Sequence, residues 1–222
     1  MNYALTIIVP VFNEQDNLQR LEKELSNYLQ IAAKPACVLL VNDGSSDNSL
    51  AMMQDICQRN AAFSYLSFVQ NCGLSAAIKA GFDAATTPWV GYIDSDLQTD
   101  PEDFNVLLAH AETHALVTGV RANRKDDFVK NMSSKIANGI RRAFTHDGVD
   151  DTGCPLKIIR TDCAKKIPMF KGLHRFLPAM ILLQNEKVIQ IPVRHYPRIA
   201  GQAKFGDRKS TRLNSSHQII SY

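Results

Sequence analysis

Long apolar runs, paired cysteines and a basic amino-terminal segment are all missing from this 222-residue sequence. There is no stretch of about 18 apolar residues, so the sequence predicts no membrane-spanning helix. The five cysteines form no Cys-x-x-Cys pair and no zinc-ligand spacing, which favours reduced, packing thiols of a cytoplasmic protein. No basic region precedes the first apolar run, so that run is predicted to be a strand rather than a signal peptide.

The composition predicts one soluble globular domain, because 45% of the residues are hydrophobic and 21% are charged. The charge is unevenly distributed. Residues 1–150 hold 18 acidic and 12 basic residues, whereas residues 151–206 hold three acidic and ten basic ones. This division suits a metal–nucleotide site that faces an anionic acceptor or a membrane surface. A chance distribution of surface charge explains the same counts equally well.

Short apolar segments rich in β-branched residues alternate with segments of helical periodicity. Strands are predicted at 5–11, 37–41, 65–69, 89–93, 116–119, 153–159 and 188–193. Helices are predicted at 16–30, 49–59, 75–84, from Pro101, and after Phe128 within 121–144, and an apolar segment covers 171–183. The alternation predicts an α/β fold with a mostly parallel central sheet and helices on both faces. Ligands bind beyond the carboxyl ends of such strands.

Asp94 and Asp96 follow the predicted strand at 89–93. Two carboxylates at this spacing in a turn converge on one hard cation, and oxygen ligands suit Mg²⁺ or Mn²⁺. Such a cation also takes diphosphate oxygens as ligands, which stabilises the charge of a departing nucleotide. An isolated Asp-x-Asp pair is more often structural, so its position at the end of a strand is what makes this pair a candidate metal site.

Three more polar motifs lie at predicted strand or helix ends. Phe12 and Glu14 follow the first strand, where an aromatic ring and a carboxylate are suited to hold a base. Asp43 in NDGSSD is a candidate acceptor of hydrogen bonds from base or ribose. The loop NCGLSAA opens a helix whose amino end can face an anion, which makes Asn71 and Gly73 candidates for binding the nucleotide-sugar. Taken singly, each of these motifs is more often an ordinary turn.

In this order, VPVFNE, NDGSSDNS, NCGLSAAIKAGFDAA and DSDLQTDPE resemble glycosyltransferase family two, the nucleotide-sugar-dependent transferases of the GT-A fold. The resemblance implies a GT-A Rossmann-like domain. The later blocks TGVRANR, DTGC, HRFLP and RIAGQAKF are most similar to the polyprenyl-phosphate branch, which includes dolichyl-phosphate mannose synthases. That branch implies a polyprenyl phosphate acceptor, a role in the cell envelope and a place at the cytoplasmic face of the membrane.

The resemblance also implies roles for individual residues. The nucleotide-sugar would be held by Pro10, Phe12, Glu14, Asp43, Asp94 and Ser95. The metal would lie among Asp94, Asp96 and Gln98. The donor and acceptor phosphates would face Arg121, Arg124, Ser134, Arg198 and Lys204. His174 and Arg175 would lie near the diphosphate or the acceptor. The residues expected to act in catalysis are Asp96, Arg121, Asp151 and Arg175.

The sequence departs from the family pattern at three positions. Phe12 replaces the commoner tyrosine, Asn42 stands where an acidic residue is frequent, and Ala203 replaces a serine. The family's carboxyl-terminal membrane helices are absent, and residues 207–222 resemble the translation of a sequencing-library adapter. We therefore expect residues 1–206 to be a GT-A domain truncated at its end, followed by a non-native tail at 207–222. A natural flexible polar tail is the alternative.

The acceptor determines which chemistry the site needs. A sugar hydroxyl needs a general base, whereas a phosphomonoester is largely ionised at pH 7 and needs cations instead. Residues 121–142 carry seven basic and two acidic residues, which favours the phosphate acceptor, although most such charges are ordinarily solvated. Asp151 stands where many relatives carry the base, so a hydroxyl acceptor is the nearest rival.

Two further rivals are a nucleotidyltransferase and a non-catalytic nucleotide-sugar binding module. The first usually has a glycine-rich, basic loop after the first strand, and VPVFNE has neither feature. Binding of nucleotide without turnover would indicate the second.

Overall fold

The computed structural model describes residues 2–121, 151–196 and 219–221. Its strands form one mixed sheet in the order β7-β5-β6-β4-β1-β2-β3-β8. The strands are β1 Leu5–Val11, β2 Ala36–Asn42, β3 Phe63–Phe68, β4 Trp89–Tyr92, β5 Leu116–Arg121, β6 Lys157–Arg160, β7 Val188–Val193 and β8 Ile219–Ser221. The helices are α1 Gln15–Ile31, α2 Ser49–Arg59, α3 Leu74–Ala84, α4 Asp103–Leu108, α6 Thr161–Lys166 and α7 Leu173–Leu182.

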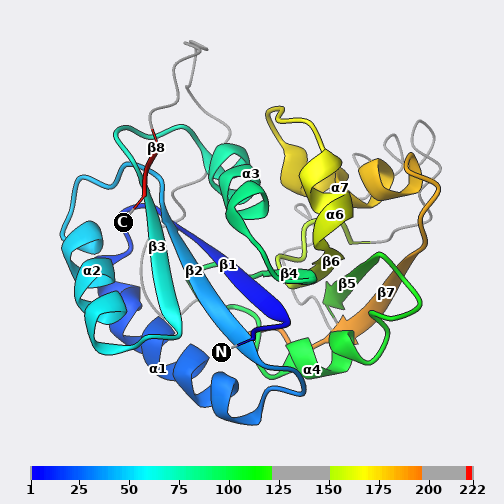
Figure 1. The fold of residues 1–222 in the computed structure, drawn as a ribbon, viewed down its shortest axis with the longest axis horizontal. Helices are drawn as coiled ribbons and strands as arrows, with labels where there is room; N and C mark the ends of the chain where they lie inside the picture. Colours follow the sequence, from blue (N-terminus) through cyan, green and yellow to red (C-terminus); the bar gives the residue numbers. More distant parts are fainter. Residues whose placement is uncertain (1, 122–150, 197–218, 222) are drawn as a thin grey trace, which may run out of the picture.

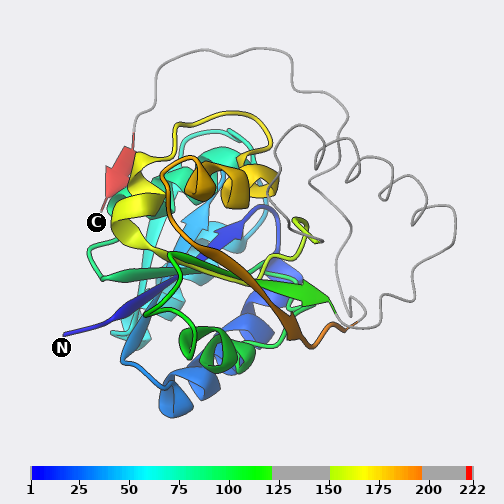
Figure 2. The same cartoon turned by 90° about the vertical axis from the view of Figure 1, so that its right-hand side faces the viewer.

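Helices cover both faces of the sheet (Figures 1 and 2), and buried side chains form a hydrophobic cluster on each face. β1 lies between the two clusters and is buried along its whole length. Ile7 and Val9 pack on one face with residues of α1, α2 and α4. Ile8 points to the other face and packs with residues of α3, α6 and α7. This two-sided burial explains the continuous apolar run of β1, and the predicted α/β fold with its mostly parallel sheet is confirmed.

Within the sheet β1 pairs in parallel with both β2 and β4, and β2 pairs in parallel with β3. The carboxyl ends of these strands therefore meet at one edge of the sheet. β5 and β7 are parallel to each other, and Val193 at the end of β7 lies opposite Arg121. β7 thus also delivers the residues that follow it to an end of the sheet.

β6 corrects one prediction. The predicted strand at 153–159 is a strand only from Lys157 on, and this strand, β6, continues to Arg160 and runs antiparallel to β4 and β5. Residues 153–156 form a loop instead. Because the direction is reversed, the first residue of β6 lies opposite Tyr92 at the carboxyl end of β4. The loop before β6 therefore reaches the edge of the sheet at which β1 and β4 end.

Other differences from the predicted elements are smaller. α6 was not predicted, and α4 begins at Asp103 rather than at Pro101, which lies in a turn. β8 falls in the tail at 207–222 that was predicted to be non-native, and it pairs antiparallel with β3. The predicted helical segment at 121–144 lies almost entirely outside the described residues. Within the described part of the chain, no helix is long and apolar enough to cross a bilayer.

Candidate functional site

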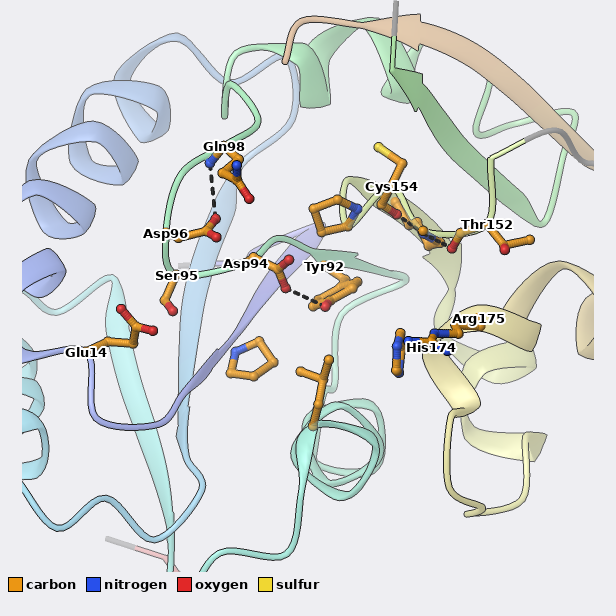
Figure 3. A pocket seen from close by; sticks show the side chains of 15 residues that line it. Glu14, Tyr92, Asp94, Ser95, Asp96, Gln98, Thr152, Cys154, His174 and Arg175 are labelled. Carbon is orange, nitrogen blue, oxygen red and sulfur yellow. Dashed lines mark hydrogen bonds between the residues drawn. The ribbon is translucent and has the colours of Figure 1, made fainter. Parts of the chain in front are cut away.

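A polar pocket of about 260 Å³ opens at the carboxyl end of β4 (Figure 3). Segments far apart in sequence form it: the ends of β1 and β4, the start of α3, the loop before β6, and the start of α7. Its lining residues are Pro10, Glu14, Leu74, Tyr92, Asp94, Ser95, Asp96, Gln98, Thr152, Gly153, Cys154, Pro155, Lys157, His174 and Arg175. Eight of the predicted site residues are therefore brought together here: Pro10, Glu14, Asp94, Ser95, Asp96, Gln98, His174 and Arg175.

Asp94 and Asp96 lie in a tight turn after β4. The Tyr92 hydroxyl donates to Asp94 Oδ1 at 2.5 Å, and the Gln98 amide donates to Asp96 Oδ1 at 3.2 Å. Asp96 is only 6% exposed. Leu97, which lies between Asp96 and Gln98, has φ 51°, a left-handed conformation that is uncommon for a residue with a side chain. The backbone is thus bent so that side chains on both sides of Leu97 line the pocket.

The chemistry of this turn fits a hard divalent cation. Three side chains that line the pocket offer oxygen ligands: the carboxylates of Asp94 and Asp96 and the side-chain amide of Gln98. Among the described residues, no group of three His, Cys, Asp or Glu side chains is arranged to hold a metal. A cation here would take its remaining ligands from a bound diphosphate, as Mg²⁺ commonly does with one or two protein carboxylates.

His174 and Arg175 face the carboxylates from the other side of the pocket (Figure 3). They are the second and third residues of α7, which follows Gly172 with φ 88°. The Gly172 amide donates to the Ser75 hydroxyl at 3.0 Å, which ties the start of α7 to the start of α3. The Arg175 guanidinium and the amino end of α7 give this wall the positive charge that an anionic ligand requires.

Lys157 forms part of the pocket and was not identified from the sequence. It is 1% exposed, and its ammonium donates to the Cys154 and Thr152 carbonyl oxygens. Burial lowers its pKa, while the nearby carboxylates of Asp151 and Asp94 act in the opposite direction. The sequence signal that could have identified Lys157 is its place within the apolar stretch CPLKII, because a lysine that is buried with such a stretch needs polar partners.

Tyr92 is a second residue that sequence reasoning missed. It is 3% exposed, and burial raises the pKa of its hydroxyl well above the ordinary value, with Asp94 adding to the shift. The hydroxyl therefore stays protonated at neutral pH and donates to Asp94. The sequence signal that could have identified Tyr92 is its place at the end of an apolar predicted strand, two residues before Asp94.

Arg121 and Asp151 bind each other next to the lining residues Thr152 and Gly153, although neither lines the pocket itself. Arg121 Nε donates to Asp151 Oδ2 at 2.7 Å, and the Arg121 Nη2 donates to Oδ1 at 3.0 Å. The Arg121 backbone amide also donates to Oδ2 at 3.4 Å, and the Gly153 amide donates to Oδ1 at 3.0 Å. Burial raises the pKa of Asp151, but the Arg121 hydrogen bonds and charge outweigh it, and the net pKa lies below the usual value. This geometry makes Asp151 a poor proton acceptor.

Asp43 binds the loop at residues 71–73, which was predicted to bind the nucleotide-sugar. Its fully buried carboxylate accepts hydrogen bonds from the amides of Cys72 and Gly73 and from the Asn71 side chain, at 2.7–3.1 Å. Burial raises its pKa to about 6, although the two amides lower it. Neighbouring Gly44 has φ 65°, and a Cβ there would lie 2.2 Å from the Gln70 carbonyl carbon, so glycine is required.

The remaining predicted residues divide into two groups. The first group lies outside the pocket lining: Asn71 and Gly73 donate hydrogen bonds to Asp43, and Phe12 is half-buried. The predicted contacts of these four residues with a nucleotide stay predictions. The predicted phosphate-binding residues Arg124, Ser134, Arg198 and Lys204 lie outside the described residues.

Known proteins share this architecture. Glucosyl-3-phosphoglycerate synthase from Mycobacterium tuberculosis, in complex with Mn²⁺, uridine-diphosphate-glucose and phosphoglyceric acid, matches with a TM-score of 0.70 at 14% identity, over 90% of this chain and 73% of that chain. A mannosyltransferase from Pyrobaculum calidifontis, in complex with GDP-Man and Mn²⁺, matches with a TM-score of 0.63 at 16% identity, over 90% and 58%. At these identities the matches show a common fold.

The sequence itself matches a family model over most of its length. The model is described as glycosyl transferase family 2, and it matches residues 6–167, which include the turn with Asp94 and Asp96 and the loop before β6. The chain belongs to glycosyl transferase family 2.

Proposed function

We propose that this chain transfers a sugar, with inversion, from a nucleoside diphosphate sugar to a polyprenyl phosphate. The observation that carries the choice of acceptor is the state of Asp151. Its carboxylate accepts two hydrogen bonds from the Arg121 guanidinium, one from the Arg121 backbone amide and one from the Gly153 amide, and its pKa is lowered. A carboxylate in this state is unsuited to take a proton from a hydroxyl, and a phosphate acceptor does not need that step.

The donor site is supported by the pocket and by the similar structures. Asp94, Asp96 and Gln98 face His174 and Arg175 across a cavity of about 260 Å³. The Mycobacterium tuberculosis and Pyrobaculum calidifontis proteins hold Mn²⁺ with a nucleotide sugar. We infer that Asp94, Asp96 and Gln98 hold Mg²⁺ or Mn²⁺, which would neutralise charge on the departing nucleoside diphosphate.

The protein's own groups then align the reactants. The Tyr92 hydroxyl fixes one oxygen of Asp94, and Lys157 fixes the carbonyls of the loop before β6. Arg175 contributes positive charge to the wall that lies opposite the carboxylates, with His174 beside it. An acceptor phosphate oxygen attacks the anomeric carbon in line, and positioning supplies much of the acceleration.

The lipid part of the proposal rests on the blocks TGVRANR, DTGC, HRFLP and RIAGQAKF, which resemble the polyprenyl-phosphate branch. Two of these blocks, DTGC and HRFLP, contribute residues to the pocket lining. A lipid phosphate would bring the reaction to a membrane surface, and we propose the cytoplasmic face, in the biosynthesis of the cell envelope.

The Asp151→Asn variant tests the acceptor. With a phosphate acceptor we expect kcat to stay within about tenfold of wild type, since no proton is transferred to Asp151. Transfer would be measured from UDP-glucose and GDP-mannose to undecaprenyl phosphate and, in parallel, to octyl glucoside. Asp162→Asn, which also removes a carboxylate bound to an arginine, Arg160, is the matched control.

Two outcomes would count against this proposal. One is a fall in kcat of roughly a hundredfold or more in Asp151→Asn with unchanged nucleotide binding, which is the loss expected for a general base. The other is a wild-type chain that glycosylates octyl glucoside but not undecaprenyl phosphate.

A further inference from the structure

The turn that carries the pocket carboxylates is held from outside by a segment almost a hundred residues further along the chain. We call residues 94–98 the carboxylate turn and residues 194–196, which follow β7, the clamp segment. We propose that Asp103 and Arg194 are positioning residues that hold the clamp segment against the carboxylate turn, so that Asp96 and Gln98 face the pocket together. The inference rests on the proposed function for its consequence in catalysis.

The carboxylate turn cannot rely on its own hydrogen bonds. Leu97 is buried with φ 51°, a conformation that is strained for a residue with a side chain and persists only where surrounding structure holds it. Inside the turn, the Leu97 amide donates to the Asp94 carbonyl at 3.4 Å and the Gln98 amide to Asp96 Oδ1 at 3.2 Å. The first bond is longer than the usual range of about 2.7–3.2 Å and the second lies at its upper end, so these two bonds hold the turn weakly.

The clamp segment supports the turn through its backbone. The Tyr196 amide donates to the Gln98 carbonyl at 2.7 Å, the shortest backbone bond made by the turn in the described structure. His195 forms an antiparallel bridge with Thr99, directly after the turn. Each of these contacts fixes the chain on the exit side of Leu97, where the direction of the Gln98 side chain is set.

Asp103 and Arg194 anchor the clamp segment itself. Asp103 is 5% exposed in the first turn of α4, and one of its oxygens accepts the Arg194 amide at 2.7 Å. Its other oxygen accepts Arg194 Nε at 2.9 Å. The same guanidinium lies 3.1 Å from Asp100 and 3.4 Å from Glu102. One arginine thus joins the end of β7 to the whole stretch that follows the carboxylate turn.

The position of α4 explains why this contact forms. α4 lies beside the end of β7 in both views of the fold (Figures 1 and 2). The chain passes from the carboxylate turn through Asp100 and Pro101 into α4 in only a few residues. Because Asp103 is buried and accepts both a backbone and a side-chain donor, it leaves the clamp segment little freedom to move. Neither Asp103 nor Arg194 lines the pocket, so each acts through the turn.

The test measures hydrogen exchange of the peptide that covers residues 94–103, with no ligand present. Asp103→Asn replaces one acceptor oxygen with an amide group and leaves an Arg194 donor without its partner. We expect exchange there to rise about tenfold, because a hydrogen bond to a charged group is lost and the turn opens more often. Arg194→Gln should give the same result. This variant is less prone to misfold, because the Arg194 side chain is 48% exposed.

A second readout separates positioning from general stabilisation. Affinity for UDP and GDP is measured with and without Mn²⁺, and we expect both variants to lose most of the gain that Mn²⁺ provides, with metal-free affinity unchanged. Asp162→Asn is the matched control, because Asp162 accepts Arg160 Nε at 2.7 Å away from the pocket. It should alter neither readout.

Unchanged exchange at residues 94–103 in both variants would overturn the proposal, as would an equal loss of affinity with and without Mn²⁺. A wild-type chain that gains no affinity from Mn²⁺ would count against the proposed function instead. The exchange measurement would still decide the role of Asp103 and Arg194 in that case.

Discussion

Replacing Asp96 with asparagine is expected to lower sugar transfer on the order of a thousandfold. The carboxylate is 6% exposed, lines the pocket and lies in the turn with the left-handed Leu97. Asparagine keeps the size of the side chain but removes the negative charge that would hold a divalent cation. Loss of the charge stabilisation that such a cation gives is worth several kcal/mol in the transition state, and each 1.36 kcal/mol is about tenfold in rate.

The measurement is the initial rate of transfer at saturating donor, with Asp83→Asn as the control, because Asp83 is an exposed carboxylate on α3 that contacts Lys79. The control should keep the wild-type rate. If Asp96→Asn were as active as the control, the assignment of the carboxylate turn as the metal site would be wrong.

Replacing Lys157 with methionine is expected to destabilise the fold by about 3 kcal/mol. Lys157 is the first residue of β6 and is almost fully buried, with its ammonium bound to the carbonyls of Cys154 and Thr152. Methionine fills a similar volume but donates nothing, so two buried carbonyl oxygens lose their donor at roughly 1–3 kcal/mol each. For a chain of this size the melting temperature should fall by about 6–12 °C.

Thermal unfolding followed by circular dichroism measures this effect, and Lys166→Met is the control. Lys166 is exposed at the end of α6, so its replacement should change the melting temperature little. Equal melting temperatures for the two variants would show that the Lys157 ammonium does not hold the loop before β6.

Local sequence patterns predicted most of the fold because each element is consistent with its own periodicity. β1 and β2 are buried on both faces, so their runs of apolar residues identify them directly. α1 buries residues at helical spacing and was predicted to within about a residue at each end. The direction of β6 could not be predicted this way, since an apolar strand shows no preference between parallel and antiparallel neighbours.

The candidate site was predictable where one motif carries the chemistry, as with Asp94 and Asp96. It was not predictable where distant residues act on one another. Nothing local to Asp151 reveals that Arg121, thirty residues earlier, occupies its carboxylate. Likewise, the residues around Asp43 in the sequence could not show that its carboxylate accepts hydrogen bonds from the loop after β3. Such pairings depend on the tertiary fold rather than on a short sequence window.

The most direct test of the proposed nucleotide-sugar site is calorimetric titration of the chain with UDP and with GDP, each with and without Mn²⁺. The site described above predicts that one nucleotide binds about tenfold more tightly when Mn²⁺ is present. That result would also name the base of the donor. Failure of a folded chain to bind either nucleotide, with or without Mn²⁺, would contradict the assignment of the pocket as a nucleotide-sugar site.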